Sequence, residues 1–182
     1  MERHHLLTER LDLRPITMAD ADRLAVLHAD ARVMNLLQHG VLTRAQSDAM
    51  VAHYEAEWPA LGFGSWTASE RATGKLVGLG GLRVHSGGLG VAMRVAFAPE
   101  AQGKGYAPEL GRAALAFAFE IAKLDRVVAI TRLDNIASQR SLEKFMARER
   151  EITTDEGRTL VLYAAFNPNS GRRNHTGRIN PK

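Results

Sequence analysis

Apolar residues recur at helical spacing in several parts of the chain. In the clearest part, successive apolar positions lie four, three and four residues apart, which predicts an amphipathic helix with one buried face. These positions are Leu110, Ala114, Phe117 and Ile121. Capping sequences predict two earlier helices, because a threonine precedes each and an acid or amide follows three residues later. They are Thr17 with Asp20, and Thr43 with Gln46 in a helix halted near Pro59 and Gly62.

Strand patterns fill most of the remaining chain. An alternating segment comes first, and three β-like runs separated by turn sequences then predict an antiparallel meander. A later, nearly continuous β-branched run is typical of a strand covered on both faces. It is followed by a helix capped at Asp134-Asn135 and expected to reach about Met146, and by two closing strands. The expected strands span residues 10–15, 63–69, 75–85, 89–97, 125–131, 147–153 and 158–166.

This order of elements predicts a mixed α/β domain. Residues 89–97, the helix after them and residues 125–131 form a candidate crossover unit with a parallel strand pair. The order lacks the regular alternation of a doubly wound fold. With 182 residues in all, we expect one domain over residues 1–170 and a basic, disordered tail over 171–182.

Composition narrows the class of protein. No apolar run approaches the roughly 20 residues that span a bilayer, and the first residues do not resemble a secretion signal. We therefore expect a cytoplasmic protein without membrane contact. The chain has no cysteine, which excludes disulfides, thiolate metal sites and a cysteine nucleophile. Its seven histidines show no metal-ligand spacing, so we expect no metal.

The net charge of +4 is located in the tail. Residues 171–182 carry three arginines, one lysine and no acid, which leaves the rest of the chain close to neutral. The folded part is therefore not expected to bind nucleic acid. We leave open a contact of the tail with ribosome or RNA.

A glycine-containing loop is the main candidate binding feature. Residues 99–109 join a predicted strand to the amphipathic helix and include Gly103, Lys104 and Gly105. Glycine lets the backbone approach a ligand closely, and the unpaired N–H groups of the first helical turn attract phosphates. A Walker loop would need Ser or Thr after Gly-Lys, and a dinucleotide fingerprint would need Gly or Ala where Pro108 stands. A tight turn without a ligand remains an alternative.

The loop resembles the GNAT superfamily of acyl-CoA N-acetyltransferases, whose pattern is Gln/Arg-x-x-Gly-x-Gly/Ala. Gln102, Gly105 and Ala107 match its fixed positions, and Gly103, Lys104 and Tyr106 occupy its variable ones. Residues 133–144 resemble the Asn-x-x-Ser-x-x-x-Leu-Glu-Lys stretch of the branch that contains ribosomal-protein N-terminal acetyltransferases. Residues 7–15 are similar to the first strand of that branch.

The resemblance implies a GNAT fold, an α/β domain whose mixed, mostly antiparallel sheet is flanked by helices and splayed between strands 4 and 5, residues 89–97 and 125–131. It implies acetyl-CoA as cosubstrate, with pantetheine paired to the strand-4 backbone, pyrophosphate on the loop amides and Asn135 bonded to the cofactor. The expected cofactor-binding residues are Ala96, Phe97, Gln102, Gly103, Lys104, Gly105, Tyr106, Ala107, Asn135 and Ser138. An N-cap role alone is the alternative for Asn135.

Two departures from the branch pattern stand out. Phe145-Met146-Ala147 replaces the usual Leu-Gly-Phe, so the glycine that ends the helix in a left-handed turn is missing. The branch often has an acid on the strand before the loop, where this chain has Ala92, with Arg94 two residues later. The identity of a general base is therefore open.

The residues favour direct attack of an amine on the acetyl thioester. An α-amine, with a pKa of about 7.7–8.0, is roughly a tenth neutral at pH 7, whereas a lysine is far less so. We expect Phe97 to offer a backbone N–H to the developing oxyanion. The resemblance implies that Ser138 donates a hydrogen bond to the leaving thiolate, with a surface serine as the alternative. The acceptor is expected to be a peptide N-terminus or a small-molecule amine such as a polyamine, amino acid or antibiotic. A non-catalytic acyl-CoA sensor and a homodimer are left open.

Overall fold

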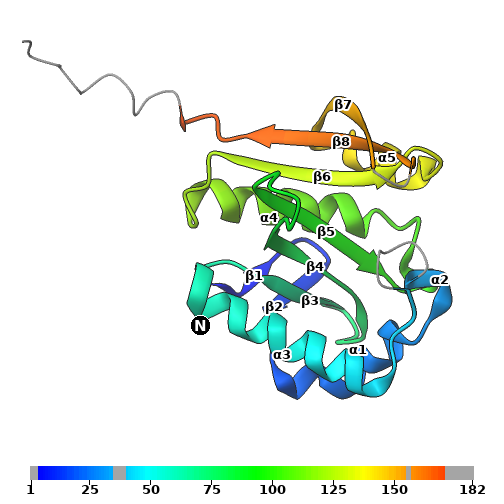
Figure 1. The fold of residues 1–182 in the computed structure, drawn as a ribbon. Helices are drawn as coiled ribbons and strands as arrows, with labels where there is room; N and C mark the ends of the chain where they lie inside the picture. The colour runs from blue at the N-terminus through cyan, green and yellow to red at the C-terminus, as the bar shows by residue number, and fades with distance from the viewer. Residues whose placement is uncertain (1–3, 35–39, 155–156, 171–182) are drawn as a thin grey trace, which may run out of the picture.

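One open sheet forms the frame of the domain. The computed structural model describes residues 4–34, 40–154 and 157–170, so the predicted disorder of the tail lies outside the described residues. The strands lie in the order β1-β2-β3-β4-β5-β6-β8-β7, and only the β5–β6 pair is parallel within the described residues. This mixed sheet with flanking helices confirms the α/β prediction (Figure 1).

The elements follow the predicted order. The strands are β1 (Leu6–Leu7), β2 (Leu11–Pro15), β3 (Ser65–Glu70), β4 (Leu76–Val84), β5 (Val91–Phe97), β6 (Arg126–Arg132), β7 (Ala147–Thr153) and β8 (Thr159–Phe166). The helices are η2 (Met18–Asp20), α1 (Ala21–His28), α2 (Ala31–Met34), α3 (Arg44–Leu61), η3 (Pro99–Ala101), α4 (Tyr106–Glu120) and α5 (Ile136–Leu142). The sequence patterns did not predict β1 or α2, which are only two and four residues long.

The splay of the sheet lies where it was expected. Strand β5 is registered with β6 at one position, Ala92 opposite Val128, whereas its contact with β4 extends over seven positions. Figure 1 shows β5 and β6 close at their first residues and diverging toward their C-terminal ends. The ladder of parallel hydrogen bonds therefore stops early, and one edge of β5 faces an opening.

Helices cover the two faces of the sheet differently. Helix α4 contributes Leu110, Ala114 and Phe117 to the larger core, where they lie with Trp58 and Trp66. Trp58, Phe63 and Trp66 are all buried there, as part of the core. Helices α1 and α2 form a second cluster with Val51 and Tyr54 of α3, Leu79 of β4 and Ala96 of β5 on the other face, so α3 contributes to both clusters.

Some helix boundaries differ from the prediction. Ile121 is 53% exposed because α4 ends at Glu120 and leaves it as the C-cap, outside the buried face. Helix α5 ends at Leu142, four residues before Met146. Its last turn tightens, with the Phe145 and Met146 N–H groups both donating to the Leu142 carbonyl, so the missing glycine is replaced by a short turn without positive φ.

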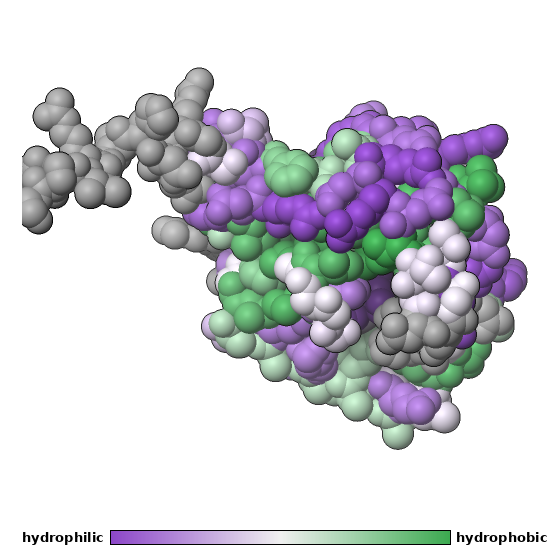
Figure 2. Space-filling model, turned by 45° about the horizontal axis from the view of Figure 1, so that its top comes forward, coloured by the Kyte–Doolittle hydropathy of each residue, from purple (hydrophilic) through white to green (hydrophobic). Residues whose placement is uncertain are grey.

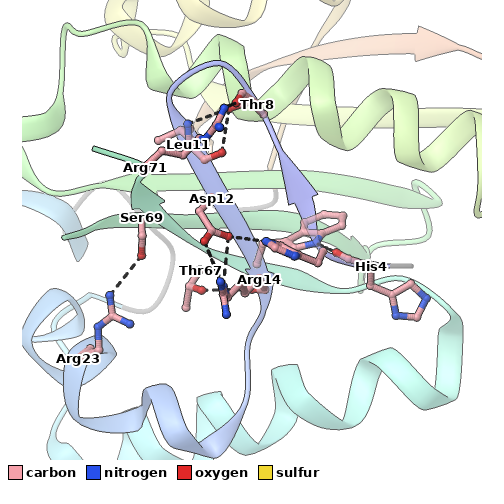
Figure 3. Close-up of polar contacts among 11 residues, drawn as sticks. His4, Thr8, Leu11, Asp12, Arg14, Arg23, Thr67, Ser69 and Arg71 are labelled. Atoms are coloured by element: carbon pink, nitrogen blue, oxygen red, sulfur yellow. Dashed lines mark hydrogen bonds and ion pairs between the residues drawn. The ribbon is translucent and has the colours of Figure 1, made fainter. Parts of the chain in front are cut away.

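An N-terminal hairpin closes one end of the sheet. The hydroxyl of Thr8 accepts from the Leu11 N–H at 2.9 Å and fixes the turn between β1 and β2 (Figure 3). Asp12 bonds both His5 and Arg14, and the Trp66 indole donates to the His4 carbonyl at 2.6 Å. The guanidinium of Arg71 donates to the Thr8 carbonyl at 2.6 Å. The hairpin is thereby tied to the sheet by side-chain contacts.

A buried histidine joins α1 to α3. His28 is 1% exposed, and its Nδ1 lies 2.8 Å from the Ser47 hydroxyl oxygen. Burial lowers the pKa of His28 below its usual 6.5, because the charged ring would lose its hydration. The folded state therefore favours the neutral ring.

We predict that the folded protein loses stability as the pH falls below 6.5, because the unfolded chain then binds a proton that His28 in the folded state resists. The loss attributable to His28 is at most about 1.4 kcal/mol per pH unit. Denaturant unfolding at pH 7.5 and 5.5 measures it. The His28→Gln variant should lose less stability between these two pH values than the wild type. Equal losses in both proteins would contradict the assignment.

Candidate functional site

The glycine loop presents its backbone at the start of α4. Gly103 and Gly105 have φ values of +74° and +83°, a region that side chains with a Cβ rarely adopt. Gly105 is the N-cap of α4. Within the described residues, no acceptor takes the N–H of Gly103, Lys104 or Gly105, and the first turn of a helix leaves its own N–H groups unpaired. This arrangement fits an anionic group such as a pyrophosphate, which stays a prediction for this loop.

Gln102 ties the loop to the end of β5. Its side-chain amide donates to the Phe97 carbonyl at 3.0 Å. The side chain therefore fixes the path of the chain between strand and loop. We interpret Gln102 as a positioning residue, and the direct cofactor contact that the resemblance implied stays a prediction.

The register of β5 decides which backbone groups face the opening. The Ala98 N–H donates to Val77 across β4, so in this antiparallel pair the backbone of Ala96 also points toward β4. The backbone groups of Val95 and Phe97 point the other way, toward β6. The backbone of Phe97 therefore faces the side where pantetheine is predicted to bind, and that of Ala96 faces β4. The contacts with pantetheine stay predictions. Val95 is an additional candidate that only the register reveals.

A cluster of polar contacts braces the loop from the N-terminal hairpin. The Arg10 guanidinium donates to the Lys104 carbonyl at 2.8 Å and lies 2.6 Å from Glu109 of α4. Glu109 also accepts from the Thr8 hydroxyl and from the Arg10 N–H. A Cβ at Gly105 would lie 3.3 Å from the Arg10 guanidinium. We name these residues, Thr8, Arg10, Lys104 and Glu109, the loop brace.

The Tyr106 side chain lies beneath the loop. It is 8% exposed, its hydroxyl donates to Glu70 of β3 at 2.9 Å, and its ring packs against Phe97. The Tyr106 hydrogen bond is the largest cause that lowers the pKa of Glu70. Glu70 lies 3.8 Å from the Lys104 ammonium. The Tyr106 side chain therefore supports the loop, and only its backbone remains a candidate for the cofactor.

The first turn of α5 carries the second predicted motif. The Asn135 side-chain oxygen accepts from the Ser138 N–H at 3.1 Å, so Asn135 is the N-cap of this helix. Both residues are half-buried, whereas Ile136 and Ala137 between them are exposed. Asn135 and Ser138 therefore share one face. The N-cap alternative for Asn135 is realised, and its bond to the cofactor remains a prediction.

Strand β5 has no acid at the position where the branch often has one, but a carboxylate lies nearby on α3. Ala92, at the position where an acid was sought, is 8% exposed and packs with Val128 and Leu162. Opposite this part of the sheet, α3 presents Glu57, whose side chain is 9% exposed and lies 3.5 Å from His53. Their four-residue spacing was visible in the sequence, but the burial of Glu57 was not.

The described residues hold no group of three or more potential metal ligands among histidine, cysteine, aspartate and glutamate. None of their helices is long and apolar enough to cross a membrane. Figure 2 shows hydrophobic residues in a band across the face turned toward the viewer, bordered by hydrophilic residues.

Comparison with known proteins identifies the family. The family model described as "Acetyltransferase (GNAT) domain" matches residues 10–147, about three quarters of the chain. The chain is a GNAT acetyltransferase. Its activity is therefore acetyl-CoA-dependent acetyl transfer, and this GNAT domain is an enzyme.

Relatives of this GNAT domain support the assignment. The uncharacterized N-acetyltransferase YnaD of Bacillus subtilis is 27% identical over 150 residues, which are 80% of this chain and 84% of YnaD. A GNAT-family acetyltransferase from Bacillus anthracis has a TM-score of 0.77 at 24% identity, covering 90% of this chain and 98% of its own. A protein of Bordetella pertussis described as a GNAT-family acetyltransferase has a TM-score of 0.76 at 26% identity. The match covers 88% of this chain and 98% of the Bordetella protein.

We predict that Arg10→Ala weakens coenzyme A binding roughly tenfold, about 1.4 kcal/mol, because the loop loses a bond to a partly exposed guanidinium. Isothermal calorimetry with coenzyme A measures the change. Arg14→Ala is the matched control, because Arg14 lies in β2 and bonds Asp12 and not the loop. If both variants bind like the wild type, the loop brace has no role in binding.

Proposed function

We propose that this enzyme transfers the acetyl group from acetyl-CoA directly to a primary amine, and that a protein N-terminal α-amine is the favoured acceptor. The observation that carries the proposal is the open edge of β5, which runs into a loop whose N–H groups have no acceptor among the described residues. A pantetheine chain paired along that edge and a pyrophosphate on the loop would bring a thioester to the divergence of β5 and β6.

The choice of acceptor rests on the residues. Residues 133–144 resemble the branch that acts on ribosomal-protein N-termini, and an α-amine is neutral more often than a lysine at pH 7. Solved structures of similar fold include a Vibrio cholerae protein proposed to be a ribosomal-protein-serine acetyltransferase, at 19% identity and TM-score 0.71. They also include an aminoglycoside acetyltransferase, at 18% identity and a TM-score of 0.71. At these identities the likeness concerns the fold alone.

The chemistry needs few groups. The chain has no cysteine to carry an acetyl thioester, so the amine attacks the bound thioester itself. Much of the rate then comes from holding two reactants in line. The N–H of Phe97 points away from β4 and is our candidate donor to the developing oxyanion. The Ser138 hydroxyl, on the same helix face as Asn135, is our candidate donor to the departing thiolate.

A panel of amines tests the acceptor. We expect coenzyme A release from acetyl-CoA to be fastest with short peptides that have a free N-terminus. Each peptide carries one lysine, and its matched control is the same peptide with an acetylated N-terminus. The control therefore offers only the side-chain amine. A polyamine, an amino acid and an aminoglycoside complete the panel. Fastest release with one of these small molecules would overturn the N-terminal assignment, and release with none of the panel would overturn the proposed function.

We predict that Ser138→Ala lowers kcat about tenfold and leaves coenzyme A affinity within about twofold, because the hydroxyl acts only as the sulfur departs. Steady-state kinetics and calorimetry separate the two effects. Ser141→Ala, in the last turn of the same helix, is the control. A Ser138→Ala enzyme with full kcat would assign Ser138 to the helix surface.

A further inference from the structure

A buried carboxylate stands across from the strand that lacks an acid. Glu57 projects from the last turns of α3, and its side chain is 9% exposed. One of its oxygens lies 3.5 Å from the His53 ring. The other, Oε2, is buried and has no hydrogen-bond partner within the described residues. Buried carboxylate oxygens are normally paired, so an unpaired one indicates a missing partner.

The surroundings of Glu57 are charged and aromatic. Its own helix contributes His53 and the buried Tyr54, and β4 contributes Arg83, whose guanidinium lies 5.9 Å from the centre of the Tyr54 ring. Arg94 of β5 faces Arg83 and Tyr54. Burial raises the pKa of Glu57, and the charges of His53 and Arg83 oppose that effect. The carboxylate therefore accepts a proton more readily than an exposed one.

The strand register places this group beside the opening of the sheet. Arg83 lies opposite Ala92, and Gly81 lies opposite Arg94, so Arg83 and Arg94 are diagonal neighbours on one face. Ala92 is also the residue at which β5 touches β6, opposite Val128. Tyr54 belongs to the same apolar cluster as Ala96 of β5. Glu57 therefore lies on the α3 face, near the point where the two strands separate.

We propose that Glu57 binds the acceptor amine through Oε2 and takes its proton before acetyl transfer. This inference rests on the proposed function and names the base that β5 does not supply. An ammonium group is the partner that a buried, unpaired carboxylate oxygen fits best, because it neutralises the charge and donates hydrogen bonds.

The steps balance without a further reactant. The ammonium gives one proton to the Glu57 carboxylate, and the neutral nitrogen attacks the thioester carbon. The carbon–nitrogen bond forms, the carbon–sulfur bond breaks, and the leaving sulfur takes the second proton from the nitrogen. Glu57 returns its proton to water through His53, whose side chain is 60% exposed. The products are the N-acetylated amine, coenzyme A and one released proton.

Glu57→Gln tests the inference, because it keeps the size of the side chain and removes its basicity. With the best amine of the panel, we expect kcat/KM at pH 7 to fall by about 100-fold to 1,000-fold. The deficit should shrink to about tenfold or less at pH 9, where an α-amine is already neutral. Affinity for coenzyme A, measured by calorimetry, should not change.

Glu55→Gln is the matched control, since it makes the same substitution on the same helix at a residue outside this cluster. It should keep the activity of the wild type at both pH values. A Glu57→Gln enzyme with wild-type kcat/KM, or with a deficit that is equal at pH 7 and pH 9, would overturn the role of Glu57 while leaving acetyl transfer intact. A wild-type enzyme that acetylates no amine of the panel would overturn the proposed function, and the role of Glu57 with it.

Discussion

The early end of the β5–β6 ladder is the constraint on which the domain depends. Parallel strands that stay paired satisfy each other's backbone groups, whereas these two meet at Ala92 and Val128 and then separate. The N–H groups beyond that point on β5 need another partner, because buried backbone donors are rarely left unpaired. Within the strand, Phe97 already shares its carbonyl with Gln102. We therefore expect an extended ligand to complete this edge as an additional strand would.

The two faces of β5 divide the chemistry of the domain. On the α4 face, Phe97 and Tyr106 pack beneath a loop that is suited to an anion. On the α3 face, Glu57, Tyr54 and Arg83 surround the same part of the sheet with charge. The separation is a consequence of strand alternation, since neighbouring residues of one strand serve opposite faces. Two reactants that approach from opposite faces meet at the point where the strands part.

The sequence predicted the order of elements well, because helical and alternating patterns are local. The capping boxes at Thr17 and Thr43 and the strands around the loop were all found where the patterns indicated. The sequence could not predict which backbone N–H and carbonyl groups of β5 face the opening. The pairing register between β4 and β5 decides whether those of Ala96 or those of Val95 do so. The burial of Glu57 was equally hidden, because it depends on how α3 packs against the sheet and not on the residues beside it in the chain. The sequence also did not predict that α5 ends at Leu142. A tight turn ends the helix there, in place of the glycine that usually does so in this branch.

The loop brace links the beginning of the chain to the middle of it. Thr8 and Arg10 reach Glu109 and the Lys104 carbonyl, about a hundred residues away in sequence. A ligand that stabilises the loop is therefore expected to stabilise these contacts with the N-terminal hairpin as well, by thermodynamic linkage. By the same linkage, an extension attached ahead of β1, such as an affinity tag, is expected to affect binding at the loop if it disturbs the hairpin. The N-terminal hairpin is thus expected to influence how tightly this enzyme holds its cosubstrate, although the hairpin contributes none of the predicted cofactor-binding residues.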